Sequence, residues 1–118
     1  MDNEDRGLIK ALTPFNDMDD ATFSDVLKDA KLTKVPGGKL IFKRADEDSK
    51  MYWVIAGSVD LLDEKFDAKN RKAGEEVTRN AIDNNSPHRL TAVSTEESKI
   101  LTIERSALGS LAGGDVET

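Results

Sequence analysis

The chain has 118 residues, of which 37% are hydrophobic and 34% are charged, and its formal net charge is −6. This length fits one domain with one core, and the acidic balance argues against a protein that holds nucleic acid through a dense Lys/Arg face. Because the chain has no cysteine, disulfides, thiolate metal sites and cysteine nucleophiles are excluded.

The first thirty residues predict two helices. The apolar stripe of the first helix consists of Leu8, Ile9, Leu12 and Phe15. Pro14 interrupts this stripe, because proline disfavours the α conformation in the residue before it. The second helix is expected to begin near Asp19, a good N-cap, with an apolar face made of Phe23, Val26, Leu27 and Ala30. The acidic N-terminus and the lack of a long apolar stretch predict a cytoplasmic protein with no membrane contact.

Beyond Lys31 the hydrophobic period changes from helical to alternating, which is typical of strands. Two glycine turns, Pro36-Gly37-Gly38 and Ala56-Gly57-Ser58, separate apolar runs. Each turn predicts a tight hairpin, since glycine supplies the positive φ angles that such turns need. The flanking strands are expected over residues 40–42, 51–56 and 58–61.

The polar segment 63–85 predicts long loops, a weak strand and one helical turn. Strands follow over 90–94 and 99–104, and a last helix over 106–111 is expected to stop at Gly113-Gly114. This order predicts a mainly β fold with flanking helices: a double-stranded β-helix or jelly roll of about eight short antiparallel strands, two N-terminal helices and a C-terminal helix. Residues 1–112 would form the domain, and 113–118 a flexible tail or the start of a linker.

Four patterns lie at characteristic spacings between Phe15 and Leu111: Phe15-x-x-Met18-Asp19-Asp20 with Phe23, and residues 35–42, 51–61 and 94–105. On these patterns the segment from Phe15 to Leu111 resembles the cyclic-nucleotide-binding domain. Their order and spacing match the first helix, the second strand pair, the strand-glycine-strand unit and the last strand of that family. The resemblance implies a non-catalytic regulatory module that acts on an effector domain or a partner protein, with a homodimer also compatible.

The family's ligand cassette implies a Phe-Gly-Glu-Leu run, whose Glu accepts a hydrogen bond from the ribose 2′-hydroxyl. Gly74 falls on the glycine before this run, and Arg79 takes the position of the Glu. A guanidinium has donors only, so it cannot repeat the ribose contact. The loss of one such bond, about 1.5 to 3 kcal/mol, lowers affinity roughly ten- to a hundredfold, so ordinary cAMP binding is not expected.

At the phosphate position of the resemblance, His88 falls on the family's Arg, with Arg89 beside it. Alternating strand geometry would let only one of them face a pocket. If Arg89 faces it, a small anion could be held there, with help from Arg79 and the N–H groups near Ala81. The structural alternative is that both arginines form a solvated face or pair with Asp83 or Glu76.

The remaining acidic and basic groups predict no chemistry. His88 is the chain's only histidine, which excludes a multi-histidine metal centre, and the run Asp46-Glu47-Asp48 is most simply a charged loop tip. No catalytic residue, metal or cofactor is expected, apart from a cyclic nucleotide as ligand. Three hypotheses follow: a regulatory domain that has lost standard nucleotide recognition, a sensor of a cyclic nucleotide or other anion through Arg89, and, least supported, an enzyme.

Overall fold

The computed structural model describes residues 3–83 and 87–111. In chain order its elements are α1 (Asn3–Lys10), η1 (Phe15–Asp17), α2 (Asp20–Lys28), β1 (Lys31–Val35), β2 (Leu40–Phe42), β3 (Lys50–Ala56), β4 (Ser58–Leu62), β5 (Ala68–Lys72), η2 (Glu76–Arg79), β6 (Thr91–Ser94), β7 (Ser98–Glu104) and α3 (Arg105–Leu111). The two N-terminal helices, the last helix and the weak strand and helical turn within 63–85 are therefore confirmed. The predicted stop at Gly113-Gly114 and the tail 113–118 lie outside the described residues.

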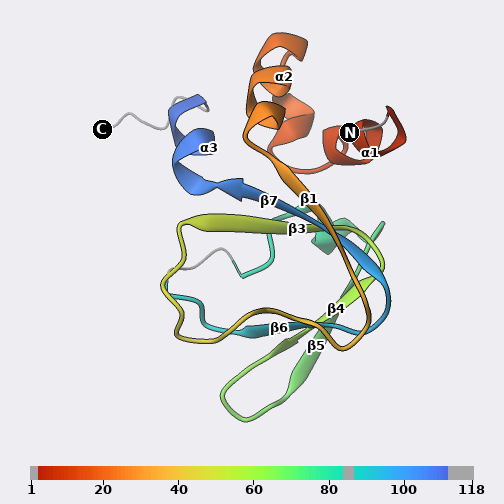
Figure 1. Cartoon of the computed structure of the whole chain (residues 1–118), viewed down its shortest axis with the longest axis vertical. Coiled ribbons are helices and arrows are strands. Elements are labelled where there is room, and N and C mark those ends of the chain that lie inside the picture. The colour runs from red at the N-terminus through yellow and green to blue at the C-terminus, as the bar shows by residue number, and fades with distance from the viewer. Residues whose placement is uncertain (1–2, 84–86, 112–118) are drawn as a thin grey trace.

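Two antiparallel sheets form the body of the fold (Figure 1). One has three strands in the order β1-β7-β3, and the other has four in the order β2-β6-β4-β5. The helices α1, α2 and α3 lie together at the end of the molecule next to the three-stranded sheet (Figure 1). This confirms the predicted mainly β, jelly-roll-like fold, with seven strands in the described residues where about eight were expected.

The prediction of two tight hairpins is wrong. β1 pairs with β7 and β2 pairs with β6, so the turn at Gly37-Gly38 joins strands of different sheets. Likewise β3 pairs with β7, while β4 pairs with β5 and β6, so Gly57 also lies between the two sheets. Both turns are corners at which the chain crosses from one sheet to the other.

Close approach of two chain segments explains the glycines at these corners. A Cβ at Gly57, whose φ is +85°, would lie 2.5 Å from the Glu97 carbonyl oxygen and 2.7 Å from the Ser98 Cα. A Cβ at Gly37 would lie 3.1 Å from the Glu96 Cα. The connection between β6 and β7 therefore runs directly against both corners. The positive φ angles that glycine allows are used here to turn the chain from one sheet to the other, and not to close a hairpin.

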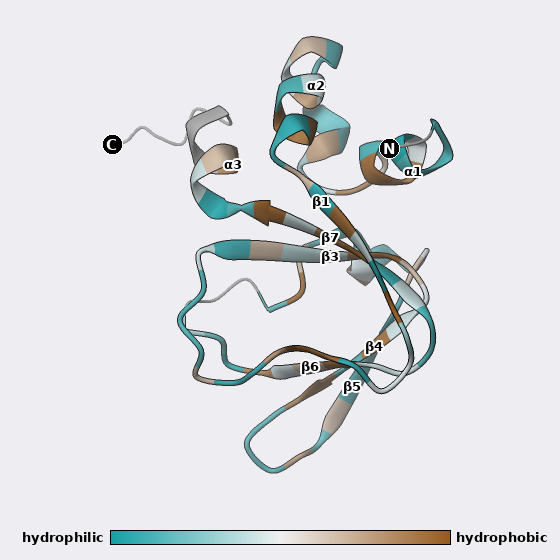
Figure 2. Ribbon diagram, in the orientation of Figure 1, coloured by the Kyte–Doolittle hydropathy of each residue, from teal (hydrophilic) through white to brown (hydrophobic). Residues whose placement is uncertain are grey.

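Each face of the three-stranded sheet is covered by its own apolar cluster. Between this sheet and the helices the buried residues are Ile9, Leu12, Phe15, Phe23, Val26, Trp53, Ile55, Leu101, Ile103 and Leu108. Between the two sheets they are Phe42, Val54, Val59, Leu61, Ile82, Ala92 and Ile100. The strands supply both clusters because successive side chains point to opposite faces: Trp53 packs under the helices, and its neighbour Tyr52 faces the space between the sheets. Unlike these apolar clusters, the loop that joins β4 and β5 is largely hydrophilic (Figure 2).

The helical layer is attached to the sheet by polar contacts as well. The Asp5 carboxylate of α1 accepts from Lys99 Nζ of β7 at 2.9 Å, and Trp53 Nε1 donates to the Thr13 carbonyl at 3.0 Å. As predicted, Asp19 caps α2 by accepting from Thr22 N at 2.8 Å. Within the described residues, no helix has the length and apolar character needed to cross a membrane.

Candidate functional site

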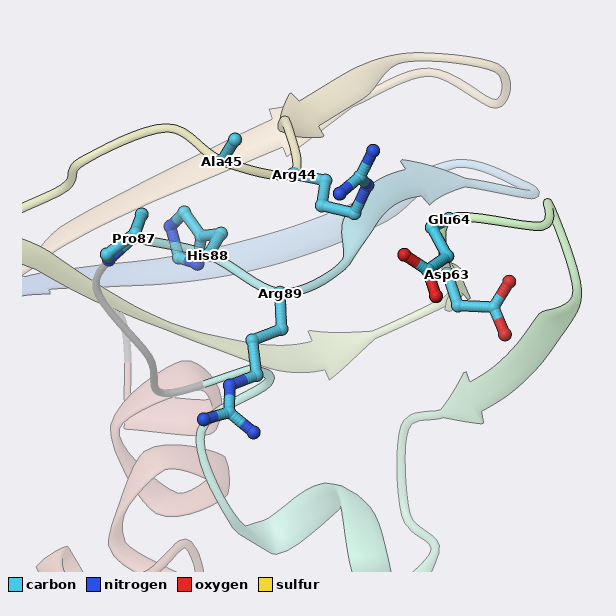
Figure 3. Close-up of a pocket in the computed structure, with 7 residues that line it drawn as sticks. All are labelled: Arg44, Ala45, Asp63, Glu64, Pro87, His88 and Arg89. Atoms are coloured by element: carbon cyan, nitrogen blue, oxygen red, sulfur yellow. The ribbon is translucent and has the colours of Figure 1, made fainter.

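The segment between η2 and β6 carries the two residues expected at the phosphate position. His88 is buried, with a side chain only 1% exposed, whereas Arg89 is exposed. The two neighbouring side chains point in different directions (Figure 3), although both lie before the start of β6 at Thr91. The buried one is the histidine.

The His88 ring lies between two carboxylates. Its Nε2 is 3.1 Å from Asp48 Oδ2, and its Nδ1 is 3.2 Å from the Asp83 carbonyl oxygen and 3.3 Å from Asp83 Oδ2. Phe42 stacks on the ring with centroids 3.8 Å apart and planes 11° apart. Each ring nitrogen of His88 therefore has an oxygen of an aspartate within 3.3 Å.

Three nitrogen atoms surround one carboxylate oxygen of Asp83. Its Oδ2 accepts from the backbone N–H of Arg89 at 2.8 Å and of Leu90 at 2.9 Å, besides its contact with His88. The side chain is 1% exposed. Its φ of 41° lies in the left-handed region, which aspartate tolerates better than most residues. This carboxylate is thus held as a bound anion would be, by consecutive backbone N–H groups and a ring nitrogen.

Asp48 completes the arrangement from the loop before β3. Its Oδ2 accepts from Tyr52 Oη at 2.5 Å, and its Oδ1 accepts from Lys50 N at 3.0 Å. Burial acts to raise the pKa of Asp48, but the hydrogen bonds from Tyr52, His88 and Lys50 outweigh it and hold that pKa below its usual value. Burial, together with the neighbouring Asp48, raises the pKa of Tyr52, which keeps its hydroxyl a donor. We call His88, Asp48, Asp83 and Tyr52 the His88 cluster.

The backbone fixes the two loops of this cluster to each other. His88 N donates to the Asp46 carbonyl at 2.9 Å, and Ala45 N donates to the His88 carbonyl at 2.7 Å. The run Asp46-Glu47-Asp48 is therefore more than a charged loop tip, because its last residue is a half-buried member of the cluster. Among residues 3–83 and 87–111, no three His, Cys, Asp or Glu side chains are placed to hold a metal ion.

The other residues expected at the ligand site line different cavities. Arg79 and Gly74 line a cavity of about 150 Å³ beside α1, where the Arg79 carbonyl accepts from Thr13 N at 2.9 Å. Ala81 lines a third cavity next to Trp53. The N–H group that follows it, that of Ile82, already donates to the Tyr52 carbonyl at 2.8 Å. The five expected residues are thus divided among three cavities, and only His88 and Arg89 line the one at the expected phosphate position.

That cavity is an open cleft of about 620 Å³, and the residues that line it are Arg44, Ala45, Asp63, Glu64, Pro87, His88 and Arg89. Its charged side chains are of both signs. Figure 3 shows the guanidinium groups of Arg44 and Arg89 pointing in different directions. Two cations that do not converge make a weaker anion site than a paired clamp.

Sequence reasoning missed Asp48, Tyr52 and the role of Asp83. Asp48 is 40 residues from His88 along the chain, so no local pattern joins them. The one available signal was the isolated histidine itself, since a buried imidazole in an acidic chain requires hydrogen-bond partners. The sequence did name Asp83 as a partner of an arginine, but it is the backbone N–H of Arg89 that donates, and the arginine side chain stays exposed.

Comparison with known structures confirms the fold. The chain superposes on the sensor domain of the transcriptional regulator DNR from Pseudomonas aeruginosa with a TM-score of 0.73 at 15% identity, covering 86% of this chain and 75% of that one. For the regulatory domain of Toxoplasma gondii PKA with cAMP, the TM-score is 0.75 at 16% identity, covering 94% and 46%. For a cyclic nucleotide-binding-like protein from Brucella abortus, the TM-score is 0.68 at 15% identity, covering 93% and 98%. The chain thus spans less than half the length of the Toxoplasma structure.

No curated protein matches the chain significantly. The family model described as the cyclic nucleotide-binding domain matches residues 32–115, which is most of the sequence. The matched span includes both sheets, the His88 cluster and the open cleft. The chain therefore belongs to the family of cyclic nucleotide-binding domains, which are regulatory and sensor modules.

Proposed function

We propose that this domain is a non-catalytic regulator that no longer holds a cyclic nucleotide in the family's usual way, and that it acts through contacts with an effector domain or a partner protein. One observation carries the proposal. The carboxylate of Asp83 occupies the N–H groups of Arg89 and Leu90, beside the residue that the family resemblance places at the phosphate.

Electrostatics supports this reading. A cyclic phosphate placed at these N–H groups would meet the Asp83 carboxylate. Two like unit charges about 4 Å apart repel by about 4 kcal/mol at an effective dielectric constant of 20, which is roughly a thousandfold in affinity. The position of the family's Arg offers no free cation in return, because His88 contacts Asp48 and Asp83.

The sugar contact is weakened independently. Arg79, at the position of the acidic ribose acceptor, has donors only, and it lines a cavity that Arg89 does not line. The absence of this acceptor adds the ten- to hundredfold loss stated above. Together the two effects support the proposal that this chain does not bind cAMP in the family's usual way.

Calorimetric titration and thermal shift with cAMP and with cGMP test the proposal, with a cAMP-binding regulatory domain as positive control. A ligand that binds only the folded state raises its stability, so binding would appear as a rise in melting temperature. We expect no such rise and no heat of binding at millimolar nucleotide. Micromolar binding of either nucleotide would reject the proposal.

A second candidate function is a sensor of a small anion, favoured by the exposed position of Arg89 at the open cleft. In that case Arg89→Ala abolishes the response to the anion, while Arg44→Ala, on the same cleft, weakens it less because its guanidinium points elsewhere. Equal affinity in the unchanged chain and in Arg89→Ala counts against this candidate.

A further inference from the structure

We propose that Asp83 is a built-in occupant of an anion-binding nest, and that removing its carboxylate turns this position into a binding site for a phosphate group. This inference rests on the proposed function, because it supplies the reason why the unchanged domain does not bind nucleotide in the usual way. It assigns to Asp83 the role of a specificity-determining residue.

The geometry of the nest is that of an anion site. Two consecutive backbone N–H groups, those of Arg89 and Leu90, converge on a single oxygen at 2.8 and 2.9 Å. The Nδ1 of His88 lies 3.3 Å from the same oxygen. Successive N–H groups that point into one concavity bind anions such as phosphate in many proteins, and here the oxygen that they hold belongs to the chain.

Burial shows that the nest has a fixed shape. The side chains of His88 and Asp83 are each 1% exposed, and Phe42 stacks on the imidazole. The backbone of His88 is bonded on both sides to the loop that contains Ala45 and Asp46. The donors would therefore keep their positions when the carboxylate is removed.

A tethered carboxylate outcompetes a free anion. Asp83 is six residues before Arg89 and seven before Leu90 in the chain, so its effective concentration at the nest is in the millimolar range or above. It also repels any second anion that approaches. Two residues of the nest, His88 and Arg89, also line the open cleft of about 620 Å³.

Two substitutions separate occupancy from charge. Asp83→Gly removes the occupant and suits the left-handed φ of 41°. Asp83→Asn is neutral but keeps an amide oxygen that can still accept from both N–H groups, and Asn also tolerates this φ. If occupancy as well as charge matters, the glycine variant gains more phosphate affinity than the asparagine variant, because only glycine frees both N–H groups.

The test is titration with inorganic phosphate, followed by ¹⁵N–¹H spectra and calorimetry, on the unchanged chain and on both variants. We expect Asp83→Gly to bind phosphate on the order of a thousandfold more tightly than the unchanged chain, with the largest shifts at the amides of Arg89 and Leu90. Asp83→Asn removes the repulsion but keeps an oxygen on both N–H groups, so it should gain clearly less affinity than Asp83→Gly. A folded Asp83→Gly variant that binds phosphate no better than the unchanged chain overturns the inference, and so does equal gain in both variants.

A measurement on the unchanged chain covers the case in which Asp83→Gly fails to fold. Scalar coupling across the hydrogen bonds should connect the amides of Arg89 and Leu90 to the side-chain carboxyl carbon of Asp83, and its absence refutes the occupancy of the nest. Titration of the unchanged chain with cAMP separates the two proposals. Micromolar binding of cAMP by the unchanged chain would reject the proposed function. If only Asp83→Gly fails to gain phosphate binding, the inference about the nest is rejected and the proposed function stands.

Discussion

His88 is the residue on which the two loops of the site depend. Its ring contacts Asp48 from the loop before β3, Asp83 from the turn after η2, and the face of Phe42 from β2. Buried charged groups are stabilising only while each has its partners. The imidazole is therefore a structural link between these two loops and β2.

Replacing the ring tests this link. His88→Ala removes the Phe42 stack and leaves the carboxylates of Asp48 and Asp83 without it, so we expect a loss of about 2–4 kcal/mol in the free energy of unfolding. Urea denaturation measures it. Arg89→Ala is the matched control, since the neighbouring side chain is exposed and should leave stability nearly unchanged. Equal effects of the two substitutions contradict the structural role of the imidazole.

Acid should weaken the fold through Asp48. Because the folded-state pKa of this carboxyl lies below its usual value, its contribution is fully present above pH about 4, the unfolded-state value. It is lost as the pH falls through the lower folded-state pKa. We expect urea midpoints measured between pH 7 and pH 2 to fall less steeply at the acid end in Asp48→Asn than in the unchanged chain. Parallel pH profiles would show that Asp48 does not contribute.

At the scale of the elements, the glycine corners show what local sequence can and cannot predict. Pro36-Gly37-Gly38 and Gly57 correctly predicted sharp turns with positive φ, which Gly38 and Gly57 adopt. The partner of each strand was not predictable from them, because pairing depends on distant residues: β1 lies against β7, with Lys31 opposite Thr102. The helix start at Asp19 was predictable for the opposite reason, since an N-cap is satisfied within three residues.

The candidate site was predictable to the same extent, in its local residues but not in its distant contacts. The sequence places His88 and Arg89 at the phosphate position from their spacing to the last strand, and the structure does bring both to one cleft. It could not show that Asp48 and Asp83 hold the ring, because hydrogen-bond partners far apart in the chain are set by tertiary packing. For the same reason Gly74 and Arg79 could not be excluded from that cleft in advance.

The Gly57 corner provides a prediction at this scale. In Gly57→Ala a methyl group would overlap Glu97 and Ser98 at a φ of +85°, so we expect a loss of about 2–5 kcal/mol in unfolding free energy from backbone strain and overpacking. The matched control is Gly7→Ala in α1, where nothing lies within 4 Å of the added Cβ. That substitution should stabilise by about 0.5–1 kcal/mol through helix propensity. Thermal melts compare the two, and a harmless Gly57→Ala would contradict the close crossing.

At the scale of the whole molecule, the strands β3 and β7 join two apolar clusters into one cooperative unit. Trp53 and Leu101 point toward the helices, while Val54 and Ile100 from the same strands point between the sheets. Neither cluster can lose its packing without disturbing strands that the other requires. We therefore expect the helical layer and both sheets to unfold in one transition.

The single tryptophan makes this testable. Trp53 is fully buried beneath the helices, so its fluorescence reports the helical cluster, while far-UV circular dichroism reports the whole backbone. Urea curves from the two probes should coincide. A fluorescence change at clearly lower urea would mean that the helices detach while the sheets persist. Val54→Ala, a substitution in the cluster between the sheets, should shift both curves together.

The edge strand of the four-stranded sheet limits how two copies of this chain can associate. β5 is at the edge of its sheet, and three of its five residues, Lys69, Arg71 and Lys72, are basic. A second copy laid alongside this edge would bring cation against cation, and lysines on outer strands are a common protection against such sheet extension. Concentrated solutions should therefore resist fibril-like growth from this side, and self-association, where it occurs, must use a different surface.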